Sequence, residues 1–303
     1  MSVSQTAEVS TYANRKKVSL PRKFIQIFPN WSSFIGALIT FAIITIAITA
    51  PIISPYHPED QNIKEAFMPP MWEAGGSQSH ILGTDALGRD LLSRIIYGMR
   101  TSLAISVCSV ILLLFIGVSI GLVAGYYGGG ILDTILMRFT DIQMALPFIV
   151  LAITILSVLQ PSIPVLIFVL ALVQWPLYAR VIRGIVLIER EADYILAAKA
   201  MGASDYRIIT KYLLRNIFIA VLILSTLDMA AMIIGEATLS FIGLGVQPPT
   251  PSLGNIMADG RLKLALYWWI TTLPGVVIFI TILGLNLFGD GMQMILDPRL
   301  RKR

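Results

Sequence analysis

Few residues of this sequence could take part in chemistry. The two histidines, His57 and His80, do not lie at a helical spacing from each other, and the single cysteine, Cys108, lies within an apolar run. These residues offer little for a metal site, and one cysteine excludes an internal disulfide. The sequence contains no G-x-x-x-x-G-K loop for phosphate, no G-x-S-x-G and no His-Glu-x-x-His pattern. We therefore expect no catalytic site, no metal site and no cofactor bound by this chain.

Two acidic residues lie in or beside an apolar segment, residues 217–235. Asp228 is within the segment and Glu236 is at its end. An ionisable side chain at membrane depth is a candidate for function because it must face protein or water rather than lipid. Both residues are therefore candidates for a translocation pathway. The alternative, which we favour for Asp228, is a hydrogen bond to a neighbouring helix.

The composition is that of an integral membrane protein. Of the 303 residues, 56% are hydrophobic and only 14% are charged, whereas soluble domains carry about 25% charged residues. The net charge of +5 could suggest nucleic-acid binding, but the basic residues are spread over short segments between apolar runs. That distribution is typical of membrane topology. We predict a lipid bilayer as the environment and no nucleic-acid partner.

Six apolar runs are candidates for transmembrane helices, because about 20 helical residues cross the hydrocarbon core. They cover residues 33–53, 103–126, 142–159, 165–186, 217–235 and 268–287, of which 142–159 is the shortest. The sequence thus predicts an all-α integral membrane protein whose transmembrane domain is residues 33–303. Residues 1–32 are polar and basic, and are predicted to form an N-terminal tail.

Lysine and arginine are distributed unevenly between the predicted spans. They are more numerous in the tail, between Arg180 and Arg215, and after Arg299 than in residues 55–100 and 237–266. By the positive-inside rule, both termini and residues 189–216 are predicted to face the cytoplasm. The segments 55–100 and 237–266 are predicted to be extracytoplasmic.

The outer segment 55–100 has too few apolar residues for a core of its own. In its last part, residues 87–99, apolar side chains form one helical stripe, and Arg89, Asp90, Ser93 and Arg94 form the other. This pattern predicts an amphipathic helix lying along the membrane surface. The alternative is a linker helix that packs on its neighbours, with Asp90 and Arg94 paired across one turn.

Residues 189–216 form a polar interruption that is too charged to cross a membrane. Helix-forming residues precede Gly202, which stands where a helix C-terminus favours the left-handed conformation. Ser204 and Asp205 then indicate the cap of a second helix. We predict an elbow of two short helices with small residues on its exposed part, which is typical of a docking element rather than a catalytic one.

Four stretches resemble the C-type membrane subunit of the bacterial dipeptide, oligopeptide and nickel ABC importers, and the resemblance extends from Trp31 to the C-terminus. They are residues 80–98 (HILGTDALGRDLLSRIIYG), 193–204 (DYILAAKAMGAS), 241–252 (FIGLGVQPPTPS) and 286–301 (NLFGDGMQMILDPRLR). Together they are specific, whereas the Ala-Ala-x-x-x-Gly element alone is shared by importer permeases of many substrates.

The resemblance implies a type I ABC importer permease fold with six transmembrane helices in the bacterial inner membrane. It also implies four kinds of partner: a second, homologous permease subunit forming a heterodimer, two ABC ATPase subunits that bind ATP and Mg²⁺, an extracytoplasmic substrate-binding protein, and the bilayer. The elbow would be the cytoplasmic coupling helix, the EAA loop, that inserts into an ATPase. Its ATPase-coupling residues would be Glu191, Asp193, Ala197, Ala198, Gly202, Ala203, Ser204, Asp205 and Arg207.

Two residues depart from the family pattern. Leu196 stands where many members have a glutamate before the paired alanines, and Arg215 stands where they have a proline. Without that proline, we expect a straighter helix leading into the fifth span.

The family implies peptides, that is di- or oligopeptides, as the first choice of substrate. Nickel chelates and glutathione are alternatives, because members of the family import them on the same scaffold. Two other classes of protein are rivals. One is an ion-coupled secondary transporter that uses Asp228, and the other is a membrane scaffold that transports nothing. The docking elbow and the lack of a visible inverted repeat argue against the secondary transporter.

Overall fold

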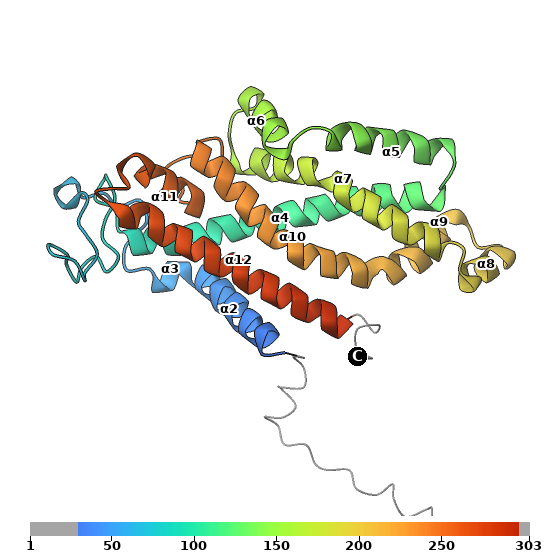
Figure 1. The fold of residues 1–303 in the computed structure, drawn as a ribbon, viewed down its shortest axis with the longest axis horizontal. Helices are drawn as coiled ribbons and strands as arrows, with labels where there is room; N and C mark the ends of the chain where they lie inside the picture. Colours follow the sequence, from blue (N-terminus) through green and yellow to red (C-terminus); the bar gives the residue numbers. More distant parts are fainter. Residues whose placement is uncertain (1–29, 297–303) are drawn as a thin grey trace, which may run out of the picture.

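The structure, a computed structural model, describes residues 30–296. These residues form an elongated bundle of helices (Figure 1). Its loop end consists of residues 54–90 together with α11 (Leu253–Gly260), and its elbow end consists of α8 (Asp193–Ala200) and α9 (Asp205–Arg207). Almost all of the predicted tail, residues 1–32, and the basic residues after Arg299 lie outside the described residues.

Five helical runs in the described part of the chain are long and apolar enough to cross a membrane. They are α2 (Trp31–Ile48), α4 (Leu91–Tyr126), α7 (Ile163–Glu189), the run Asp205–Ile242 that ends in α10 (Leu214–Ile242), and α12 (Trp268–Leu296). A sixth span exists only if α5 (Ile131–Met144) and α6 (Phe148–Val158) are counted together. The short elements are α3 (Ala50–Ile53), η1 (Ile63–Glu65), η2 (Ile208–Leu213) and η3 (Arg261–Lys263).

The predicted third span, residues 142–159, is wrong as a single continuous helix. The axes of α5 and α6 differ in direction by 89°, and the first residues of the predicted span belong to α5. Pro147 lies in the break, where its ring removes a backbone donor and disfavours a helical conformation for Leu146. Two ion pairs hold α5 along α7. Arg183 Nε lies 2.5 Å from Asp133 Oδ1, and Arg180 pairs with Asp141.

Helix α4 lies at the centre of the bundle and packs most extensively against α7. Three glycines at four-residue spacing, Gly117, Gly121 and Gly125, form a stripe that faces α7. A Cβ at Gly121 would lie 2.8 Å from the carbonyl oxygen of Ala179, and a Cβ at Gly125 would lie 2.6 Å from the Cβ of Val186. The missing side chains therefore allow the two backbones to approach closely, as is common between helices in membranes.

Within residues 30–296, the first and last helices, α2 and α12, lie side by side (Figure 1). At the loop end they join α4 and α11 in an apolar cluster that includes Leu91, Ile256 and Trp269. A second cluster lies between α4, α6, α7 and α10, and a third joins α4 and α7 to the elbow end. These clusters connect both ends of the bundle to its spans.

The predicted surface helix over residues 87–99 is also wrong. Helix α4 begins at Leu91 and continues through its span without a break. The polar stripe does not face water, because Arg89, Asp90, Ser93 and Arg94 are all buried. Nor is Asp90 the ion-pair partner of Arg94, as the alternative supposed. Asp90 pairs with His80, while Arg94 pairs with Asp85.

Candidate functional site

The elbow contains two short helices joined at Gly202, as predicted. Gly202 has a φ of +80° after the last turn of α8, which is the left-handed conformation that glycine adopts without strain. Its N–H donates to the carbonyl of Lys199 at 2.9 Å, and the N–H of Ala203 donates to that of Ala198 at 3.0 Å. This pair of bonds is a Schellman motif, which satisfies the last carbonyls of the helix. Ser204 occupies the N-cap position of α9, but its side chain makes no capping hydrogen bond.

The predicted coupling residues all lie at the elbow end, but not all of them are exposed. Ala198 is only 1% exposed, because α8 places it on the same face as buried Ile195, three residues earlier. The small-residue face that we predicted therefore lacks Ala198. The exposed members of the set are Glu191, Asp193, Ala197, Gly202, Ser204, Asp205 and Arg207, and Ala203 is half-buried.

The sequence analysis missed the large apolar side chains at the tip of the elbow. Met201 is 79% exposed and Tyr206 is 78% exposed, on either side of the Gly202 turn, and Leu196 is also exposed. Large apolar side chains exposed within one short segment are typical of protein interaction sites. One sequence feature could have indicated these exposed apolar side chains: Leu196 is apolar at a position where the family often has a glutamate.

Asp205 ties the elbow to the end of α4. Its carboxylate accepts hydrogen bonds from the hydroxyls of Tyr126, at 2.6 Å, and Tyr127, at 3.2 Å. Burial and the carboxylate of Asp205 both raise the pKa of Tyr127. The ammonium group of Lys199 lies 5.2 Å from the centre of the Tyr126 ring. Asp205, which we predicted to contact a partner, is thus already engaged within its own chain.

A second set of contacts joins the elbow to α7 and α10. The hydroxyl of Tyr194 donates to Glu189 at 2.7 Å, and the amide of Asn216 donates to the same carboxylate at 3.2 Å. Burial, and then the hydrogen bond to Glu189, raise the pKa of Tyr194 to about 12. Arg190 donates to the carbonyls of Tyr126 and Gly128, at 3.2 and 3.0 Å. The elbow is therefore attached to the spans on both sides.

The run from α9 into α10 has no break at Arg215, which agrees with the absence of the family's proline. It is not a uniform α-helix, however, because residues Ile208–Leu213 are π-helical. A π-helical turn contains one extra residue per turn and is often found at functional sites. This turn lies directly between the elbow and the long helix α10, so a displacement of the elbow would reach the span through it.

The two acidic pathway candidates lie on α10, but the structure does not bring them together. They are eight residues apart, which is about 12 Å along a helix. Glu236 is completely buried and accepts hydrogen bonds from Ser102 on α4 and from Ser240, both at 2.7 Å. Ser102 in turn accepts from the N–H of Leu253 at 3.3 Å. Glu236 thus links α4, α10 and α11 rather than facing an open space in this conformation.

Asp228 is half-buried in the middle of α10. It lies near Tyr178 on α7, whose hydroxyl is buried without a hydrogen-bond partner within the described residues. The two groups approach each other but do not reach hydrogen-bonding geometry. Tyr178 on the neighbouring helix is nevertheless the hydrogen-bonding group that faces Asp228, so the interpretation that we favoured for Asp228 stays a prediction.

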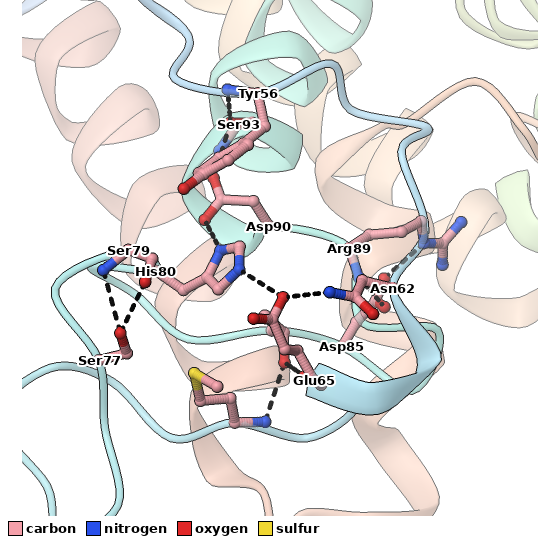
Figure 2. Close-up of polar contacts among 12 residues, drawn as sticks. Tyr56, Asn62, Glu65, Ser77, Ser79, His80, Asp85, Arg89, Asp90 and Ser93 are labelled. Atoms are coloured by element: carbon pink, nitrogen blue, oxygen red, sulfur yellow. Dashed lines mark hydrogen bonds and ion pairs between the residues drawn. The ribbon is translucent and has the colours of Figure 1, made fainter.

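At the loop end, His80 connects the 54–90 segment to the start of α4 (Figure 2). One ring nitrogen lies 2.9 Å from Asp90 Oδ1, and the other lies 3.3 Å from Glu65 Oε2. Asp90 also accepts from the N–H and hydroxyl of Ser93, and it caps α4. Both ring nitrogens therefore face carboxylate oxygens of the same chain, so His80 has a partner within its own chain on each ring nitrogen.

Four charged side chains, three of them buried, form a cluster beside this histidine. Asp85 is almost completely buried and pairs with Arg89 Nε at 2.6 Å and with Arg94. Both arginines also reach Asp259 of α11, at 3.2 and 3.1 Å. The cluster joins the 54–90 segment, α4 and α11 at one point. Within residues 30–296, no group of three or more His, Cys, Asp and Glu side chains is placed to hold a metal ion.

Comparison with known protein families shows which proteins this chain is similar to. Residues 117–302 match the model of the binding-protein-dependent transport system inner membrane component, and residues 24–70 match the N-terminal TM domain of oligopeptide transport permease C. The dipeptide transport system permease protein DppC of Haemophilus influenzae is 38% identical over 90% of this chain and 92% of its own length. The protein of the same name from Escherichia coli K12 is 37% identical over 97% of this chain and 100% of its own.

A solved structure shares the fold. An inward-facing structure of the MetNI methionine ABC transporter superposes with a TM-score of 0.58 at 19% sequence identity, covering 68% of this chain and 98% of that one. The fold is therefore that of a type I ABC importer permease, a multi-pass membrane component of a transporter. This chain belongs to the family of binding-protein-dependent transport system inner membrane components, and within it to the C-type permeases of the dipeptide, oligopeptide and nickel importers.

Proposed function

We propose that this chain forms half of the translocation pathway of an ATP-driven importer of di- or oligopeptides and couples that pathway to cytoplasmic ATPases through the elbow. The observation that carries the proposal is the elbow itself, an exposed pair of helices with apolar side chains at its tip, joined to α10 by a π-helical turn. The relatives named above as dipeptide permeases support peptides as the substrate.

The proposed complex contains two permeases, two ATPases and a binding protein. The second permease, homologous to this chain, completes the pathway as a heterodimer. The ATPase subunits bind ATP and Mg²⁺, and the substrate-binding protein delivers peptide at the extracytoplasmic face. Family membership supports the binding protein, because the family is named for its dependence on one.

The proposed orientation places the elbow end in the cytoplasm and the loop end outside. The arginines and lysines of residues 180–215 support it by the positive-inside rule. Both termini are then cytoplasmic, in the inner membrane of a bacterial cell. Protease accessibility from each side of sealed vesicles would test this orientation.

In the proposed mechanism, closure of the ATPases displaces the elbow, and α10 carries the displacement into the membrane. Interfaces that are packed in two alternative ways convert such small displacements into rocking of whole helices. Met201 and Tyr206 would fill the ATPase cleft, and the exposed charges Asp193 and Arg207 would set the register at its rim. Glu191 is held partly by Arg190, at 3.0 Å, and would contribute to the same rim.

The experiment that tests this proposal is the substitution Gly202→Glu. The variant places a charged side chain in the left-handed turn of the elbow, and we expect the ATPases to dissociate on purification and peptide uptake to fall to background. Gly243→Glu is a matched control at the other end of the bundle, since Gly243 follows α10, also has a positive φ, +97°, and has open space around it. Normal ATPase binding and uptake by Gly202→Glu would refute the proposal.

Substrate and energy source need separate measurements. Uptake by the reconstituted complex should stop when ATP is depleted and survive an uncoupler. The opposite result would favour an ion-coupled transporter with Asp228 as its coupling residue. The ligand of the binding protein, measured by calorimetry with dipeptides, nickel chelates and glutathione, would identify the substrate. We expect peptides to bind most tightly.

A further inference from the structure

An apolar groove of about 430 Å³ lies between α2 and α4, with α10 and α12 at its floor. The α4 wall carries Ala104, Val107 and Cys108, and the α2 wall carries Ile44 and Ile48. These side chains are short and apolar, so the groove has a shape and chemistry suited to hydrocarbon. The pathway candidates Asp228 and Glu236 do not line it.

Arg100 is the one charged residue of this groove. Its side chain is exposed and forms no hydrogen bond or ion pair with any residue in the described part of the chain. From Thr101 to the end of α4 at Tyr126 there is no charged residue, so Arg100 stands where the membrane-crossing part of the helix begins. A cation at that depth is at the level of lipid headgroups, where an anion is available to pair with it.

The groove runs from the headgroup level toward the middle of the membrane. Cys108 follows Arg100 by eight residues, and Thr40 on α2 precedes Ile48 by eight, so each wall extends about 12 Å along its helix. One leaflet of the hydrocarbon core is about 15 Å thick, half of the roughly 30 Å of a bilayer. The groove therefore has the length of a single leaflet, with its cation at the outer end.

We propose that this groove is a binding site for one anionic phospholipid, whose phosphate pairs with Arg100 and whose acyl chain lies between α2 and α4. A transmembrane helix of the partner permease would cross both leaflets and would need an apolar surface about twice as long. The single cation at one end also matches an amphiphile with one charged head. No elbow residue and neither pathway candidate lines the site, so the proposal does not depend on the proposed function.

Lipid retention by the intact transporter tests the proposal. The complex is exchanged into bilayers of equal phosphatidylglycerol and phosphatidylcholine, extracted in mild detergent, and analysed by native mass spectrometry. We expect one phosphatidylglycerol to remain bound to the wild type. Arg100→Gln should weaken this retention about fivefold, the effect of one cation near an anionic surface, whereas Arg100→Lys should preserve the preference.

Two further variants separate the groove from general charge. Ala104→Trp fills the groove without changing any charge, and it should abolish retention of the lipid. Arg138→Gln removes an exposed arginine of α5 that lies outside the groove, and it should leave this lipid in place. Equal retention of both lipids by the wild type, or unchanged retention by Arg100→Gln and Ala104→Trp, would overturn the proposal.

The single cysteine offers a direct measurement of what fills the groove. A benzophenone attached to Cys108 in the assembled complex and activated by light should form adducts with phospholipid. Adducts with the partner permease instead would show that a protein segment occupies the groove, and would overturn the proposal. Cys108→Ser, treated in the same way, gives the background from cysteines of the other subunits.

Discussion

At the loop end, a cluster of buried charged side chains is paired within its own chain, whereas the charged side chains at the elbow end are mostly exposed. Asp85, Arg89 and Arg94 are all nearly inaccessible and join three parts of one chain. Asp193 and Arg207 of the elbow are exposed and form no ion pair among the described residues. A charged side chain that is paired within its own chain stabilises the fold. A charged side chain that is exposed and unpaired is available to bind another chain.

We expect mutations at the loop end and mutations at the elbow end to have different consequences. Substitutions at the loop end should lower stability, because they leave buried groups without partners. Substitutions at the elbow should alter docking and transport while the protein remains folded. Four changes, taken in order of decreasing expected effect, test that division.

Arg94→Met should have the largest effect on stability. It removes one of the two cations that pair with buried Asp85 and one of the two that reach Asp259. Loss of one partner from a buried ion pair costs about 3 kcal/mol, since the remaining charge is left uncompensated. Thermal unfolding of the purified complex should show this loss, with Lys64→Met as an exposed control in the same segment. An unchanged melting temperature would mean that this cluster does not hold the loop end.

Glu236→Ala should cost about 2 kcal/mol, because the hydroxyls of Ser102 and Ser240 lose their hydrogen-bond acceptor inside the bundle. Glu236→Gln keeps the shape and one acceptor oxygen, so its effect on the melting temperature should be well under half as large. If instead both variants melt normally but transport fails, Glu236 acts in the pathway, and the division between structural and functional charges moves into the middle of the bundle.

Gly202→Ala should cost roughly 1 kcal/mol, confined to the elbow, because alanine is strained at a φ of +80°. No atom lies within 4 Å of a Cβ at this position, so overpacking adds nothing. We expect a normal melting temperature and reduced ATPase-coupled uptake. Gly202→Asn should retain more uptake than Gly202→Ala, since asparagine tolerates the left-handed conformation better. A large fall in melting temperature would show that the elbow is part of the folding core.

Tyr194→Phe should have the smallest effect, a few tenths of a kcal/mol at neutral pH, because the bond to Glu189 is exposed. The pKa of Tyr194 is raised to about 12, above the ordinary value near 10. The contact is therefore fully present below pH 10 and is lost as the pH rises through about 12. The tyrosinate absorbance difference between wild type and variant should titrate in that range. A midpoint at or below 10 would mean that the hydroxyl does not bond to Glu189.

Local chemistry made several features predictable. The C-terminus of α8 at Gly202 follows from the glycine itself, and the long spans follow from uninterrupted apolar runs. The resemblance of four motifs predicted the family, which the comparisons confirmed. The roles of the coupling residues and of Asp228 remain predictions.

Features that depend on distant partners could not be predicted in this way. The spacing of Arg89, Asp90 and Ser93 is that of the polar face of a surface helix. A buried polar residue and a solvated one cannot be told apart from such spacing, so the sequence predicted the wrong environment. One partner of this stripe is Asp259, which pairs with Arg89 and lies 170 residues away along the chain. The third apolar run is long enough for a span, so its length alone predicted one straight helix. It gave no indication of the 89° change of direction beside Pro147.

The sequence by itself determined that this chain lies in a membrane, which apolar segments form its five long spans within residues 30–296, and that a polar elbow interrupts them. These properties depend on hydropathy and on turn residues, which act locally. Only the tertiary structure decided which polar residues are buried, that Ala198 faces inward while Met201 and Tyr206 face outward, and that Arg100 stands alone at the end of an apolar groove. Burial depends on which helices pack against one another, and that information is not contained in any single segment.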